Sequence, residues 1–140
     1  MIFRIAQFLS VLTLTIMAIA PARAQPAQLV MFERSDCRWC LAWHREVGGG
    51  YPLSDEGKTA PLRRVDLDGE RPGDLAKLAI LYTPTFVLVA CGRETGRITG
   101  YPGADFFYPR LDNLLEQMES AAKQGCADVP QGKLPIANVE

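Results

Sequence analysis

The chain has 140 residues, of which 15 are basic and 16 acidic, and its formal net charge at pH 7 is −1. A chain of this length forms one domain at most. This charge argues against nucleic acid as a partner, because nucleic-acid binding requires a basic face.

The first 24 residues have the order of parts of a secretory signal peptide. Arg4 precedes an apolar run over residues 8–20, and Ala22 and Ala24 frame a cleavage site after Ala24. The alternative is an uncleaved anchor helix, but the run is shorter than the roughly 20 apolar residues that span a bilayer. We therefore expect three parts: a signal peptide (1–24), one domain (25–126) and a flexible tail (127–140).

Apolar runs and turn residues predict the elements of the first half of this domain. Residues 29–32 form a short buried strand. A helix follows over about 37–47, with Asp36 as its N-cap. Residues 62–68 predict a second strand, and leucines at helical spacing predict a second helix over 74–82.

The second half predicts a hairpin and a closing helix. Residues 85–90 are rich in strand-forming residues, and 97–101 suits an antiparallel partner across a glycine-flanked turn. The last helix runs from about 105 to 124 with one apolar stripe. This order predicts an α/β domain with a mixed sheet of about four strands and helices on both faces.

The stretch "CRWCLAWH" places Cys37 and Cys40 three apart, with the only histidine, His44, four residues further on. The pair does not fit a haem-attachment motif, because that motif needs histidine directly after the second cysteine and Leu41 stands there. Zinc needs four ligands in closed geometry, and His44 lies about 10 Å along a helix from Cys37. We therefore expect no metal and no other cofactor.

The position of Cys37 at the start of a helix favours a redox-active pair. A thiol in the first turn of a helix meets unpaired backbone N–H groups, which favour the reactive thiolate. Cys37 is then the exposed nucleophile, and Cys40, one turn later, is the shielded residue that resolves the mixed disulfide. The alternative is an inert bridge, which stabilises little because it closes a short loop.

The chain resembles the thioredoxin superfamily over roughly residues 29–124. The resemblance rests on "CRWC" after a strand and on "TPT" opening a hairpin. It implies that Pro84 is a cis-proline facing the disulfide and that Thr83 touches substrate. Arg38 and Trp39, between the cysteines, are further candidates for binding a substrate protein.

"YPLSDEG", "TPTFVLV" and "GRITGYPGADFFYPRL" are similar to the periplasmic thioredoxin-like proteins of bacterial sulfur-oxidation gene clusters. This likeness implies a periplasmic, monomeric reductant that keeps a partner's cysteine in its thiol state, the partner being the sulfur-carrier complex. It also implies a membrane-embedded thiol electron donor, because the periplasm has no soluble reductant pool to match that of the cytosol.

The chain departs from ordinary thioredoxin at the buried acid that assists proton transfer to the resolving cysteine. By alignment on the cysteine pair, Met31 occupies that position. Cys40 therefore needs another base, and Glu33 is the nearest candidate for proton transfer, with His44 a weaker one.

The other two cysteines lie in the hairpin turn and beyond the last helix. In a thioredoxin-like fold the end of that helix returns toward the turn, so we expect a structural bridge between Cys91 and Cys126. Two unpaired thiols are the alternative. Phe106, Phe107 and Tyr108 suit core and helix-start packing, with a docking surface as the alternative.

These observations favour a thiol:disulfide oxidoreductase acting as a reductant on protein thiols and disulfides. Two alternatives stay open. One is an exported oxidant that donates disulfides, and the other is a non-catalytic binding module that the disulfides brace.

Overall fold

The computed structural model describes residues 27–123. The first half contains β1 (Gln28–Glu33), α1 (Arg38–Trp43), the π-helical segment η1 (His44–Gly48), the 3₁₀ turn η2 (Tyr51–Leu53), α2 (Asp55–Thr59) and β2 (Leu62–Asp66). The second half contains the 3₁₀ turn η3 (Gly73–Leu75), β3 (Thr85–Ala90), β4 (Arg93–Thr99) and α3 (Ala104–Lys123). Among these residues no helix is both long enough and apolar enough to cross a membrane.

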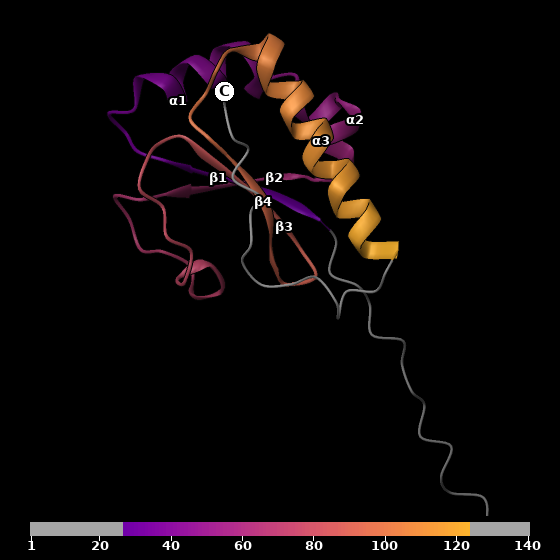
Figure 1. Ribbon diagram of the computed structural model, residues 1–140. Helices are drawn as coiled ribbons and strands as arrows, with labels where there is room; N and C mark the ends of the chain where they lie inside the picture. Colours follow the sequence, from indigo (N-terminus) through magenta and orange to yellow (C-terminus); the bar gives the residue numbers. More distant parts are fainter. Residues whose placement is uncertain (1–26, 124–140) are drawn as a thin grey trace, which may run out of the picture.

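Four strands form one mixed sheet in the order β2-β1-β3-β4. β1 is parallel to β2 and antiparallel to β3, and β3 and β4 form an antiparallel hairpin. The predicted mixed sheet of four strands in a thioredoxin-like fold is confirmed. Figure 1 shows the three α-helices along one side of this sheet. Helices were predicted on both faces, but within the described residues the opposite face carries only the 3₁₀ turn η3.

The core has two parts because successive side chains of a strand point to opposite faces of the sheet. On the helix side, Leu29 and Met31 of β1 pack with aromatic residues of α1 and α3. Trp43 is fully buried there, with its ring 5.3 Å from that of Phe86 and 5.8 Å from that of Phe107. On the opposite side Val30 and its neighbours form a smaller cluster, whose other buried members are Phe32, Val65, Leu75 and Val87.

The helix predicted over 74–82 is wrong. Only η3 forms there, and the rest of this segment lies over the smaller cluster as turns and irregular chain. Arg71 donates a hydrogen bond to the carbonyl of Leu78, and Arg97 donates one to the carbonyl of Ala79, each at 2.8 Å. These contacts come from outside the segment, so local helical spacing did not decide its structure.

The hairpin turn is shorter than predicted. Ala90 pairs with Arg93, so only Cys91 and Gly92 form the turn, and both have positive φ angles of 54° and 71°. Two residues with positive φ match the twist of the flanking strands. Residues 93–96 therefore belong to β4 and not to the turn.

Candidate active site

Cys37 and Cys40 form a disulfide at the start of α1, with their Cα atoms 5.2 Å apart. Cys37 is 8 % exposed and Cys40 1 % exposed, so Cys37 is the more accessible of two buried residues. Asp36 was the predicted N-cap, but Cys37 itself occupies that position. Its Sγ accepts a hydrogen bond of 3.1 Å from the backbone N–H of Cys40, because the extended backbone of an N-cap turns its side chain toward the first helical turn.

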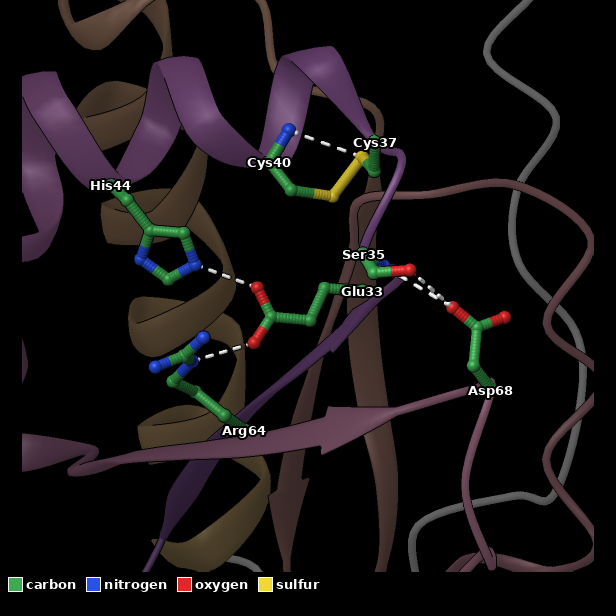
Figure 2. A network of polar contacts seen from close by, with 7 residues as sticks. All are labelled: Glu33, Ser35, Cys37, Cys40, His44, Arg64 and Asp68. Carbon is green, nitrogen blue, oxygen red and sulfur yellow. Dashed lines mark hydrogen bonds and ion pairs between the residues drawn. A yellow bond between two sulfur atoms is a disulfide. The ribbon is translucent and has the colours of Figure 1, made fainter.

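Hydrogen bonds and an ion pair to Asp68, just after β2, hold the segment that leads into Cys37. Ser35 donates two hydrogen bonds to Oδ2 of Asp68, one from its backbone N–H at 3.2 Å and one from its hydroxyl at 3.1 Å. Arg34 adds an ion pair with Asp68 at 3.6 Å. These contacts fix the approach to the disulfide, and Figure 2 shows Ser35 between the disulfide and Asp68.

Arg38 and Trp39 stand on the outer side of the disulfide. Both are exposed, and the Arg38 guanidinium lies 4.7 Å from the centre of the Trp39 ring. An exposed cation stacked on an aromatic face offers both charge and apolar area to a partner. Their role in binding a substrate protein stays a prediction.

Thr83 and Pro84 lie directly before β3, and the peptide bond between them is cis. Thr85 pairs with Phe32 near the end of β1, so β3 starts beside the end of β1. The chain leaves β1 at this same end of the strands and continues to Cys37. Pro84 is buried and Thr83 half-buried.

Glu33, the last residue of β1, is a buried charged residue with two basic partners (Figure 2). Its Oε2 lies 2.6 Å from Nε2 of His44, and its Oε1 accepts a hydrogen bond of 2.5 Å from Nε of Arg64. A buried carboxylate is costly unless it is paired, and these two contacts pair both of its oxygens.

A cavity of about 340 Å³ connects this carboxylate with the disulfide. Cys40, Glu33, His44 and Arg64 line it, together with Arg34, Ser35, Leu41 and Asp66. No group of three or more His, Cys, Asp or Glu residues that could hold a metal occurs within residues 27–123.

Sequence reasoning missed Arg64, Ser35 and Asp68 as parts of this site. Arg64 and Asp68 are distant in sequence from Cys37, and only the parallel pairing of β1 with β2 brings them near it. A charged residue inside a predicted strand was the one available signal for Arg64. The π-helical turn that begins at His44 was missed as well.

The remaining candidates are the three aromatic residues at 106–108 and the second pair of cysteines. Phe107 is fully buried in the core, whereas Phe106 is 62 % exposed. Tyr108 is half-buried, and burial raises its pKa. Cys91 is in a disulfide, but Cys126, like residues 1–26, lies outside the described residues, so the Cys91–Cys126 pairing stays a prediction.

A redox-spaced disulfide at the start of a helix, on this mixed sheet, defines a thioredoxin-fold thiol:disulfide oxidoreductase. Among solved structures the chain is similar to the periplasmic thioredoxin SoxS from Paracoccus pantotrophus in its reduced form. The two share 44 % sequence identity over 66 % of this chain and 98 % of that chain, with a TM-score of 0.61. This chain therefore belongs to the SoxS-type proteins of the thioredoxin superfamily.

More distant structures share the fold alone. A thioredoxin from Thermus thermophilus is 20 % identical, over 69 % of this chain and 78 % of that one, with a TM-score of 0.56. Thioredoxin f2 from Chlamydomonas reinhardtii is 21 % identical, over 70 % and 83 % respectively, with a TM-score of 0.52. No protein-family model and no curated protein matched the chain.

Proposed function

We propose that this protein is an exported, periplasmic and monomeric reductant that keeps a cysteine of a partner protein in its thiol state. Similarity to a periplasmic thioredoxin along nearly the whole length of that protein supports this role. The signal-like residues 1–24, with cleavage after Ala24, supply the route of export. The partner is the sulfur-carrier complex of bacterial sulfur oxidation.

In the proposed reaction the Cys37 thiolate attacks the substrate disulfide and forms a mixed disulfide, releasing the first substrate sulfur as a thiolate. Cys40 then attacks Sγ of Cys37, the Cys37–Cys40 disulfide forms, and the second substrate sulfur leaves. Two electrons pass from the cysteine pair to the substrate. A membrane-embedded thiol donor returns them and reduces the pair again.

One observation carries the assignment of roles. Sγ of Cys37 is the atom that accepts the Cys40 N–H hydrogen bond, and a hydrogen bond to the charged form favours that form. Cys37 is also the more accessible of the two cysteines. It is therefore the nucleophile, and the enclosed Cys40 is the resolving residue.

The substrate groove has two walls in this proposal. Arg38 and Trp39 form the outer wall through their exposed cation and aromatic ring. Thr83 and Pro84 form the other wall, where β3 starts beside the end of β1. The groove receives an extended segment of the partner that carries the reactive cysteine.

The direction of electron flow is tested by the reduction potential of the Cys37–Cys40 pair. The purified mature protein is equilibrated with glutathione buffers, and the fraction of disulfide is read by mass spectrometry. A potential near thioredoxin's, about −270 mV, supports a reductant. A potential near about −120 mV would instead establish the exported disulfide donor.

A second experiment separates catalysis from bracing. Cys37→Ser should abolish the reduction of a protein disulfide, whereas a binding module braced by disulfides would show no such activity to lose. Unchanged activity in this variant overturns the proposed mechanism.

A further inference from the structure

A buried carboxylate shares a cavity with the resolving cysteine. The Glu33 side chain is 10 % exposed, and both of its oxygens contact basic side chains, those of His44 and Arg64. Three elements meet in this contact, because Glu33 ends β1, Arg64 lies in β2 and His44 begins η1. Figure 2 shows the carboxylate between these two side chains and on the same side as the disulfide.

The alternation of side chains along β1 explains why Glu33 faces the disulfide. Leu29 and Met31 both lie in the core cluster that contains the two cysteines, and Glu33 is the next residue on that face. Met31 is fully buried among apolar side chains. Glu33 is therefore the ionisable residue of this face of β1, at the end of the strand from which the chain passes to Cys37.

Cys40 has little other access to water. It is 1 % exposed, yet it lines the 340 Å³ cavity with Glu33 and His44. One water molecule occupies about 30 Å³ of liquid, so the cavity has room for a chain of water molecules between the thiol and the carboxylate. Water in this cavity can therefore carry a proton from Cys40 to Glu33.

The other charged groups that face the pair are known from the same cavity. They are Arg34, Arg64 and Asp66. Arg64 contacts Glu33 directly, whereas Arg34 pairs with Asp68 and Asp66 accepts a hydrogen bond from the backbone of Asp68. Of the residues that line the cavity, Glu33 and His44 are the carboxylate and the imidazole that contact each other.

We propose that the Glu33–His44 pair is the proton acceptor for Cys40 when Cys40 resolves the mixed disulfide, and that Arg64 positions the carboxylate. This inference rests on the proposed function of the cysteine pair. The Cys40 thiol loses its proton through water to Glu33, where His44 shares it. The Cys40 thiolate forms the bond to Sγ of Cys37, and the substrate sulfur leaves as a thiolate with the electron pair of the broken bond. When the donor reduces the pair, the proton returns to Cys40 by the same route.

The two chemical steps are separated by reaction of the reduced protein with 5,5′-dithiobis(2-nitrobenzoate) in a stopped-flow instrument. Attack by Cys37 releases the first thionitrobenzoate, and attack by Cys40 releases the second. The aryl thiolate leaves readily, so loss of the Cys40 proton limits the second release. General-base catalysis contributes about 10²- to 10⁴-fold to such steps.

In Glu33→Gln the second release should slow about 10²-fold, at the low end of general-base effects, while the first release stays within about twofold. The pH dependence of the second release should also change, because the pair no longer takes up the proton. Glu33→Asp keeps a carboxylate and should recover part of the rate, whereas His44→Gln should alter the pH profile with Glu33 in place. Asp74→Asn, which removes a carboxylate from an ion pair with Arg63 outside the cavity, is the matched control and should leave the pH profile of the second release unchanged.

The first release is an internal check that each variant is folded around Cys37. A second release that stays within twofold of the wild-type rate in Glu33→Gln across the pH range overturns the inference. Equal slowing of both releases also overturns it, since this would mark a structural role. If the wild-type protein gives no second release, the proposed function itself fails.

Discussion

The backbone N–H of Cys40 donates a hydrogen bond of 3.1 Å to Sγ of Cys37. The two cysteines are therefore unequal, because one sulfur receives a donor at the helix start and the other is enclosed. A hydrogen bond to the charged form of a thiol favours that form. This contact therefore supports Cys37 as the proposed nucleophile.

Replacement of either cysteine should give a different product. Cys40→Ser should accumulate a mixed disulfide between Cys37 and a substrate protein, because no residue is left to resolve it. Cys37→Ser should accumulate none. Non-reducing electrophoresis and mass spectrometry measure both products, and a stable adduct on Cys40 in Cys37→Ser would reverse the assigned roles.

Trp39→Ala should weaken the recognition of proteins without affecting the chemistry of the disulfide. The ring is 50 % exposed and stacks on Arg38, so its loss should change stability by no more than about 0.5 kcal/mol. We expect the KM for insulin reduction to rise about threefold, the effect of losing an exposed contact worth under about 1 kcal/mol. Leu53→Ala, at a side chain that is 78 % exposed in η2, is the matched control. An equal rise in KM for that variant would contradict a specific role for Trp39.

Gly57→Ala should destabilise the protein strongly. A Cβ at this position would lie 1.8 Å from the carbonyl oxygen of Tyr51, so the backbone of η2 or α2 must move. We expect a loss of about 3 kcal/mol in the free energy of unfolding, at the upper end of overpacking costs. Gly49→Ala, where no atom lies within 4 Å, should change it by less than about 0.5 kcal/mol. Urea denaturation compares the two, and similar values for both variants would contradict the contact.

Asp112→Asn should stabilise the protein at neutral pH but not in acid. Burial and the nearby carboxylates of Glu56 and Glu116 hold the pKa of Asp112 above its ordinary value. A carboxyl with a raised pKa binds more protons when folded, so stability is lost as pH rises from the ordinary pKa through the raised one. The uncharged amide removes this loss, and the gain should be below about 1 kcal/mol because solvent screens this exposed group. Thermal unfolding at pH 3 and pH 7 measures the difference, which a larger gain at pH 3 would contradict.

A bridge between Cys91 and Cys126 should appear in a peptide map. Cys91 is in a disulfide, and its predicted partner lies outside the described residues. Digestion without reductant should yield one linked pair of peptides that contains both residues and separates on reduction. The double variant Cys91→Ala/Cys126→Ala should lose about 2–4 kcal/mol of stability, as is typical of a structural disulfide. A peptide that links Cys91 to Cys37 or Cys40 would contradict the separation of structural and reactive pairs.

The sequence predicted the reactive pair and the sheet because both depend on local patterns. The spacing of Cys37 and Cys40 is a contiguous motif, and the short apolar runs predicted β1 and β3 within about a residue at each end. The run of strand-forming residues after Pro84 also predicted that β3 starts at Thr85. These features need no knowledge of contacts between distant residues.

Errors arose where distant contacts decided the local structure. The segment 74–82 has helical spacing of its leucines, but Arg71 and Arg97 bind two of its carbonyl groups. Its side chains that pack on the sheet are those of Leu75, Leu78 and Ile80. The turn at Cys91 is tight because the strands on both sides pair up to Ala90 and Arg93. Local propensity is a weak prior that such packing overrides.

The sequence by itself determined the class of chemistry, because a redox disulfide requires little more than two cysteines one helical turn apart. Only the tertiary structure decided the surroundings of that disulfide. Glu33, His44 and Arg64 are separated by 11 to 31 positions in the chain and meet because parallel pairing aligns β1 with β2 while α1 and η1 pack on the same face. Hydrogen bonds between distant residues form only after the backbone has brought them within about 3 Å, and no spacing along the sequence specifies that approach.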